Sequence, residues 1–139
     1  MKIIIVILGI VIFNTSFGQS PFISIKNKIE LNKAKEKAEA DGKLLYMIIS
    51  AKWCGACQSL EANLKELSLD DYFKKNIVLA KTDYDKFSDS DLVWELFSGK
   101  ASWSAPTNVY FVKGKEYPVM IKGAMDKSEI LAKVKGLKK

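Results

Sequence analysis

The segment Trp53-Cys54-Gly55-Ala56-Cys57 constrains this chain more than any other, because it holds the only two cysteines in the sequence. A continuous apolar run over residues 44–49 precedes it, and leucines recur at helical spacing over residues 58–67. A strand, a Cys-x-x-Cys pair and a helix in this order are typical of a redox pair. A disulfide between cysteines only three residues apart would form a very short loop, which removes little entropy from the unfolded chain. This argues against a purely stabilising role for the pair. We therefore predict that the pair exchanges electrons.

The first 18 residues are predicted to be a signal peptide. Lys2 is followed by an apolar run over residues 3–13, which is short for a membrane span but suits the core of a secretory signal. Ser16 and Gly18 place small residues at −3 and −1 of a cleavage site before Gln19. No cysteine follows the run to carry a lipid anchor. We expect residues 1–18 to be removed rather than kept as a membrane anchor, and residues 19–139 to form one domain in the periplasm or outside the cell.

The composition argues against two classes of function. All 22 basic residues are lysines, set among 16 acidic residues for a net charge of +6, and arginine is absent. Sequence-specific binding of nucleic acid relies on the guanidinium fork, so we expect no nucleic-acid partner. Histidine is also absent, which removes the Cys–His nucleophile pair and imidazole metal ligands. Two cysteines cannot close a zinc site, which needs four ligands, so we expect no metal and no cofactor beyond the cysteine pair.

The remaining segments predict an α/β domain. Strands are predicted near residues 22–25, 44–49, 77–80, 108–112 and 119–122, and helices over residues 27–40, 58–67, 88–98 and 126–137. The run over 44–49 is apolar without alternation, which is typical of a central strand covered on both faces. A glycine-containing turn over residues 113–115 joins the last two strands into an antiparallel hairpin. We predict a mixed sheet with helices on both faces.

Four features in order carry a family resemblance. They are the motif at residues 53–57, Lys81 at the end of the second core strand, Pro106-Thr107 at the start of the third, and Gly123 before the last helix. With them the chain resembles the thioredoxin-fold superfamily over residues 22–137. The resemblance implies a thioredoxin-like α/β fold, with a central mixed sheet of four or five strands and helices on both faces.

Within the superfamily, residues 52–61 and 69–79 are most similar to a compact secreted branch. This branch includes small endoplasmic-reticulum relatives and the C-terminal domain of the periplasmic Dsb reductase. The chain departs from thioredoxin in two places. Ile48 occupies the position of a buried aspartate that helps move the proton of the second thiol. The segment between Lys81 and Pro106 is longer.

That longer segment contains three aromatic residues, Trp94, Phe97 and Trp103. We expect these side chains to pack in the core under the connection, with a binding surface as the alternative.

The two cysteines have different expected roles. Cys54 would lie at the N-terminus of the following helix, where the helix dipole and free N–H groups favour the thiolate, and would act as the nucleophile. Cys57, one turn later and more buried, would resolve the mixed disulfide. Gly55 keeps the turn uncrowded, and Ala56 adds neither the rigidity of proline nor the charge of histidine. Because strongly oxidising relatives tend to carry histidine in this pair, the resemblance favours reduction or isomerisation over oxidation.

Four other residues are expected to shape the site. The resemblance implies that Pro106 follows a cis peptide bond and places the Ala105 backbone beside Cys54 to pair with an extended substrate; a trans proline that starts a strand is the alternative. Trp53 is expected to flank the site, with core packing as its alternative. Lys81 either tunes the cysteines or is a surface lysine.

These observations predict an exported thiol–disulfide oxidoreductase that acts on protein thiols and disulfides. Because no nucleotide-binding motif is present, it would take electrons from a partner such as a membrane reductase. A monomer is expected. The alternatives are a module that binds clients or copper without turning over disulfides, and a purely structural disulfide.

Overall fold

The computed structural model describes residues 19–87, 91–92, 96 and 104–139. The predicted signal peptide at residues 1–18 lies outside this part of the chain, as do the three aromatic residues Trp94, Phe97 and Trp103. Among the described residues, no helix is both long and apolar enough to cross a bilayer.

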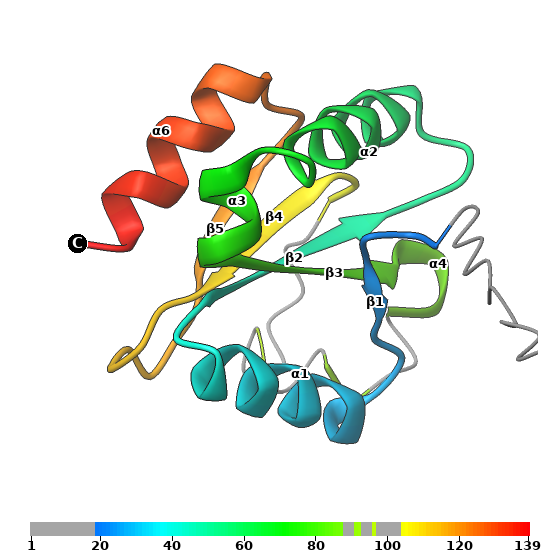
Figure 1. Ribbon diagram of the computed structural model, residues 1–139. Coiled ribbons are helices and arrows are strands. Elements are labelled where there is room, and N and C mark those ends of the chain that lie inside the picture. Colours follow the sequence, from blue (N-terminus) through cyan, green and yellow to red (C-terminus); the bar gives the residue numbers. More distant parts are fainter. Residues whose placement is uncertain (1–18, 88–90, 93–95, 97–103) are drawn as a thin grey trace, which may run out of the picture.

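Five strands form one mixed sheet in the order β1-β3-β2-β4-β5 (Figure 1). They are β1 Ile23–Ser24, β2 Leu44–Ser50, β3 Ile77–Asp83, β4 Thr107–Phe111 and β5 Val119–Lys122. β1, β3 and β2 run parallel, whereas β4 and β5 are antiparallel to their neighbours. The mixed sheet and the final hairpin are therefore as the sequence predicted.

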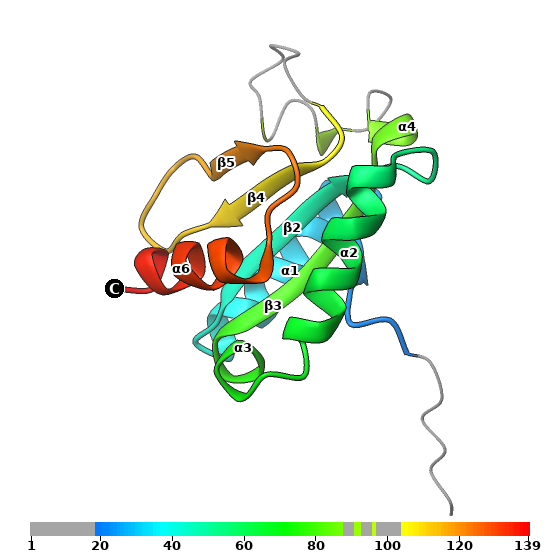
Figure 2. The ribbon, with the colours of Figure 1, turned by 90° about the horizontal axis from the view of Figure 1, so that it is seen from above.

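Helices cover both faces of the sheet, as Figures 1 and 2 show. α1 (Lys28–Ala40) lies on one face, and α2 (Gly55–Leu67), α3 (Asp71–Asn76) and α6 (Lys127–Leu137) lie on the other. The short α4 (Tyr84–Phe87) follows β3. Every residue of β2 is buried, because the strand lies between β3 and β4 and has a helical layer above and below it. This thioredoxin-like arrangement confirms the predicted fold class.

The second core strand is longer than the predicted range of residues 77–80. β3 continues through Thr82 to Asp83, and α4 begins at Tyr84, so Lys81 lies inside the strand rather than at its end. Strand pairing explains the difference, since Thr82 is buried and paired with Ile49 of β2. Of the helix predicted over residues 88–98, only 91, 92 and 96 are described; Leu92 and Leu96 are buried in the core on the α1 side.

Local signals place the helix ends. The side chain of Asn27 caps α1 by accepting from the Glu30 N–H, and Gly42 after that helix has a φ of 65°, which favours glycine. Asp126 and Glu129 form a capping box at the start of α6. Hydrogen bonds from the Glu129 backbone and the Ser128 side chain lower the pKa of Asp126.

A buried polar network ties β2 to the hairpin of β4 and β5. The Tyr46 hydroxyl donates to Oδ1 of Asn108 at 2.5 Å, and the Asn108 amide donates to the carbonyl oxygens of Ile121 and Gly123 at 3.0 and 2.8 Å. Tyr46 and Tyr110 are partners across the two strands, with ring centroids 4.4 Å apart. Burial raises the pKa of Tyr46, and raises that of Tyr110 to about 12, so both hydroxyls stay protonated donors.

Candidate active site

The two cysteines lie where β2 gives way to α2, and they form a disulfide. Their Cα atoms are 5.2 Å apart. Cys54 is 7% exposed and Cys57 is fully buried, so Cys54 is the member of the pair that another molecule reaches first. Access to a sulfur is one of the factors that set the rate of thiol–disulfide exchange.

Cys54 caps the N-terminus of α2. Its backbone is extended, and its Sγ accepts a hydrogen bond from the Cys57 N–H at 3.1 Å. α2 therefore begins at Gly55, three residues before the predicted start. The helix dipole and this N–H both stabilise negative charge on Sγ, which favours the Cys54 thiolate when the pair is reduced.

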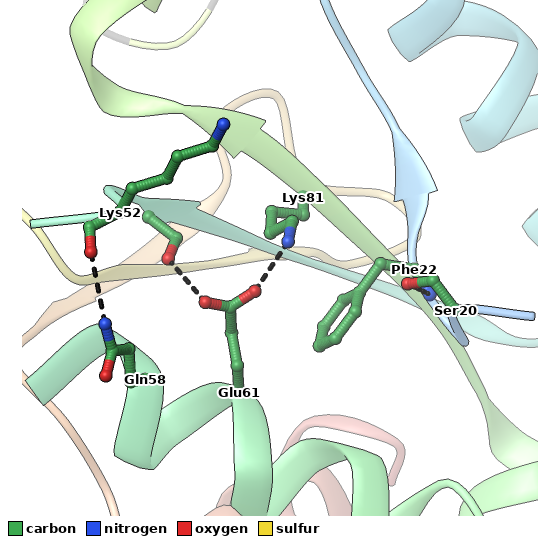
Figure 3. Close-up of polar contacts among 7 residues, drawn as sticks. Ser20, Phe22, Lys52, Gln58, Glu61 and Lys81 are labelled. Carbon is green, nitrogen blue, oxygen red and sulfur yellow. Dashed lines mark hydrogen bonds and ion pairs between the residues drawn. The ribbon is translucent and has the colours of Figure 1, made fainter. Parts of the chain in front are cut away.

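The residues between the cysteines leave the site open. Gly55 and Ala56 are both exposed. A Cβ added at Gly55 would meet no atom within 4 Å, so packing within the chain does not require glycine there. The Gln58 side chain donates to the carbonyl oxygen of Lys52 at 3.1 Å, which ties the loop before Cys54 to the first turn of α2 (Figure 3).

The start of β4 faces the cysteine pair. The Ala105–Pro106 peptide bond is cis, and the Ala105 carbonyl oxygen lies 3.7 Å from Cys54 Sγ. Ala105 packs with Ala51 and both cysteines in one small apolar cluster. The Pro106 carbonyl oxygen accepts from the Gly123 N–H at 2.8 Å, which fixes this corner to the end of β5. Ala105 thus lies beside Cys54, and a cis peptide bond joins it to Pro106.

Trp53 flanks the pair on the solvent side. Its side chain is 65% exposed, its Nε1–H donates to both carboxylate oxygens of Asp85 at 3.0 and 3.1 Å, and its ring meets that of Tyr84 edge to face. The alternative of core packing is therefore excluded. The hydrogen bonds and the ring contact hold a large apolar surface in place next to Cys54.

Lys81 lies on the α2 side of the sheet and forms an ion pair. Its Nζ is 2.6 Å from Oε1 of Glu61, a residue of α2, and 5.4 Å from the centre of the Phe22 ring (Figure 3). The other carboxylate oxygen of Glu61 accepts from the Ser50 hydroxyl at 3.1 Å. Ile48, at the position of the thioredoxin aspartate, is fully buried between β3 and β4.

Sequence reasoning missed two residues of this site, Glu61 and Asp85. Glu61 had a usable signal, because it follows Cys57 by four residues and so lies on the same face of the helix. No sequence signal pointed to Asp85, since its contact with Trp53 depends on how α4 is placed beside residues 53–57. Over the described residues, no group of three or more cysteine or carboxylate side chains could hold a metal ion.

The arrangement is suited to thiol–disulfide exchange. That reaction needs an attacking thiolate, a second thiol within reach, and a surface that holds the substrate. Cys54 at the helix N-terminus supplies the first and Cys57 the second. The exposed Trp53 ring and the Ala105 backbone lie beside Cys54 as candidates for the third.

Comparison with known proteins places the chain in one family. The family model described as Thioredoxin matches residues 27–136. The chain is 27% identical over 107 residues to Thioredoxin H8 of Arabidopsis thaliana. This alignment covers 77% of this chain and 66% of that protein. The chain is 36% identical over 66 residues to Thioredoxin-1 of Drosophila yakuba. That alignment covers 48% of this chain and 58% of the fly protein.

A solved structure agrees with these matches. The crystal structure of the germline-specific thioredoxin Deadhead from Drosophila melanogaster superposes with a TM-score of 0.62 at 26% identity, covering 84% of this chain and 99% of the other. The chain spans between 26% and 66% of the length of four curated relatives that it matches. Since the family model matches most of the chain, and the cysteine pair lies at the start of α2, this protein belongs to the thioredoxin family.

Proposed function

We propose that this protein is an exported thiol–disulfide oxidoreductase that exchanges the Cys54–Cys57 disulfide with protein substrates. The observation that carries the proposal is the position of Cys54: it caps α2, accepts the Cys57 N–H, and is the more exposed of the two sulfurs. Membership of the thioredoxin family supports the same chemistry. We also propose that the protein belongs to the compact secreted branch of the superfamily, because residues 52–61 resemble that branch.

Export rests on the N-terminal sequence. An apolar run over residues 3–13 after Lys2, and small residues before Gln19, are the features of a cleaved secretory signal. When the full chain is expressed in a bacterial host with a general secretion pathway, we expect the mature protein outside the cytoplasm with Gln19 as its first residue. N-terminal sequencing checks this. A chain that stays in the cytoplasm with residues 1–18 attached would contradict export.

Reduction or isomerisation is the proposed direction, because the pair carries no charged residue between the cysteines. The mature protein is expected to accelerate insulin reduction by dithiothreitol, and Cys54→Ser to abolish the acceleration. Its reduction potential, measured against glutathione, is expected between about −270 and −180 mV, the range of thioredoxin and disulfide isomerase. A potential near −120 mV would indicate an oxidant, and one below about −300 mV a structural disulfide.

The source of electrons follows from the proposed location. Outside the cytoplasm, nicotinamide-dependent reductases of the cytosol do not reach the pair, so we propose a membrane protein as the electron donor. A monomer suits this exchange, because Cys54 and Trp53 must face the donor and the client in turn. Light scattering of the mature protein checks the monomer; a stable dimer that buries Trp53 would contradict it.

A further inference from the structure

A groove lies beside the cysteine pair on the β3 side of β2, whereas Ala105 lies on the β4 side. It has a volume of about 600 Å³, and its walls come from the ends of β1, β2 and β3, from α4 and from the first turns of α2. Ala51 lines the groove and also packs against Cys54 and Cys57, so the groove begins next to the pair. A client segment bound at Cys54 can therefore extend from Ala105 towards the groove.

Lysine side chains dominate the lining of this groove. Four lysines and two carboxylates line it, which leaves an excess of two positive charges at neutral pH: Lys26, Lys52, Lys81 and Lys86 against Glu61 and Asp83. Four of the twelve lining residues are lysines, about twice the share of lysine in the whole chain, so the lysine-rich composition does not account for them. One carboxylate is already neutralised, because Glu61 forms the ion pair with Lys81.

The other three lysines keep their charges for a partner. Lys26, Lys52 and Lys86 are exposed, and within the described part of the chain none of their ammonium groups takes part in an ion pair. Figure 3 shows the Lys52 ammonium group apart from the ion pair of Glu61 and Lys81. The three lysines come from separate segments, after β1, before the cysteine motif and within α4. The fold therefore gathers unpaired positive charge around one groove.

The groove is continuous with the exposed surface of Trp53. Trp53 follows Lys52 directly in the chain. Its indole N–H binds Asp85, which precedes Lys86 in α4, and the Asp85 N–H donates to Asp83 in the groove wall at 2.9 Å. An extended chain spans about 3.3 Å per residue, so client residues about two to four positions from the attacked cysteine come within reach of these lysines.

We propose that Lys26, Lys52 and Lys86 select client proteins that carry acidic residues beside the reactive cysteine, in an inference that rests on the proposed function. Selection acts on the first step, in which the Cys54 thiolate attacks the client disulfide. Carboxylates near the attacked sulfur are drawn to the groove, which raises the rate of encounter. Each exposed ion pair contributes little alone, so the preference comes from the three lysines together and is screened by salt.

Three peptides that differ only in the charge around one cysteine measure this selection. Each carries the cysteine as a mixed disulfide with thionitrobenzoate, flanked on both sides by glutamates, by glutamines or by lysines. The Cys54 thiolate attacks the peptide sulfur and thionitrobenzoate leaves as a coloured thiolate, so stopped-flow absorbance with the reduced mature protein gives the rate constant of this step. Dividing each rate constant by that for 2-mercaptoethanol removes differences in the intrinsic reactivity of the peptides.

At low ionic strength, we expect the glutamate peptide to react about tenfold faster than the glutamine peptide, and the lysine peptide to be the slowest. Sodium chloride at about 0.5 M is expected to reduce the preference below about twofold, because it screens the charges. The triple variant Lys26→Gln, Lys52→Gln, Lys86→Gln is expected to lose most of the preference even at low salt. Equal corrected rates for the three peptides with the wild-type protein would overturn the proposal. If the triple variant does not fold, Lys52→Gln alone serves, with a partial loss.

The matched control is the triple variant Lys65→Gln, Lys74→Gln, Lys75→Gln. Its lysines are also exposed and its net charge falls by the same amount, but they lie on α2 and α3 outside the lining of the groove. It is expected to keep the full preference for the glutamate peptide. An equal loss in both triple variants would show that only net charge matters, and would overturn the proposal. So would loss of the preference in sodium phosphate but not in sodium chloride of the same ionic strength, because the groove would then take small anions.

Binding without chemistry separates this inference from the proposed function. The glutamate peptide with serine in place of its cysteine is expected to shift the amide NMR signals of Lys26, Lys52 and Lys86, and not those of the control lysines. Shifts at the groove from a protein that does not accelerate insulin reduction would contradict the proposed function alone. Insulin reduction without these shifts, and with equal peptide rates, would contradict the selection of acidic clients alone.

Discussion

Replacing Cys57 with alanine is expected to turn a short-lived mixed disulfide into a stable one that can be isolated. Cys54 keeps its position at the N-terminus of α2 and still attacks client disulfides. Without the second thiol, no group within the pair can break the bond that forms. We expect the Cys57→Ala protein to carry client proteins in reductant-sensitive adducts, which non-reducing electrophoresis and mass spectrometry would identify.

The matched control for this experiment is the Cys54→Ser, Cys57→Ala double variant. It keeps the fold and the exposed Trp53 surface but has no sulfur to form an adduct. Client proteins that co-purify with the double variant under native conditions would be bound non-covalently and would favour a binding module. Adducts missing from Cys57→Ala as well would contradict the proposed attack by Cys54 on proteins.

Replacing Asn108 with leucine is expected to cost about 3–5 kcal/mol of the free energy of unfolding, because it leaves several buried polar groups without partners. Asn108 is fully buried, accepts from the Tyr46 hydroxyl, and donates to two backbone carbonyls at the end of β5. Leucine fills a similar volume but pairs with none of them. Urea unfolding, monitored by tryptophan fluorescence and circular dichroism, measures the loss.

Two further variants separate the network from general packing. Tyr110→Phe changes the neighbouring ring, whose hydroxyl lies 3.8 Å from the Met125 sulfur, a weak acceptor; we expect it to cost less than about 1 kcal/mol. The Tyr46→Phe, Asn108→Leu double variant is expected to cost less than the sum of its single changes, since it removes both ends of one hydrogen bond. Additive costs would show that the Tyr46–Asn108 bond contributes little.

The site places its more exposed sulfur, that of Cys54, on a buried scaffold. β2 is buried along its whole length and ends at Ser50, four residues before Cys54. The buried network anchors the hairpin whose first corner carries Ala105 and Pro106. This construction holds the Ala105 carbonyl oxygen beside Cys54, while Trp53 and the residues between the cysteines remain open to a partner.

The sequence by itself determined the elements and the chemistry of the cysteine pair. Apolar runs predicted the buried strands, and helical periodicity predicted the helices over residues 27–40, 58–67 and 126–137, because both patterns depend on residues close together in the chain. The spacing of Cys54 and Cys57 before a helix was enough to predict a redox pair.

Only the tertiary structure decided what surrounds that pair. From the sequence, Trp53 could flank the site or pack in the core, and Lys81 could act on the cysteines or lie at the surface. Nothing in the sequence indicated that Asp85 would accept a hydrogen bond from the tryptophan, or that Glu61 would form an ion pair with the lysine. These contacts depend on the register of β2 with β3 and on the path of α4, which neighbouring residues do not specify. A pair of cysteines can therefore be recognised from the sequence, whereas the side chains that surround the pair come from distant segments and are identified only in the fold.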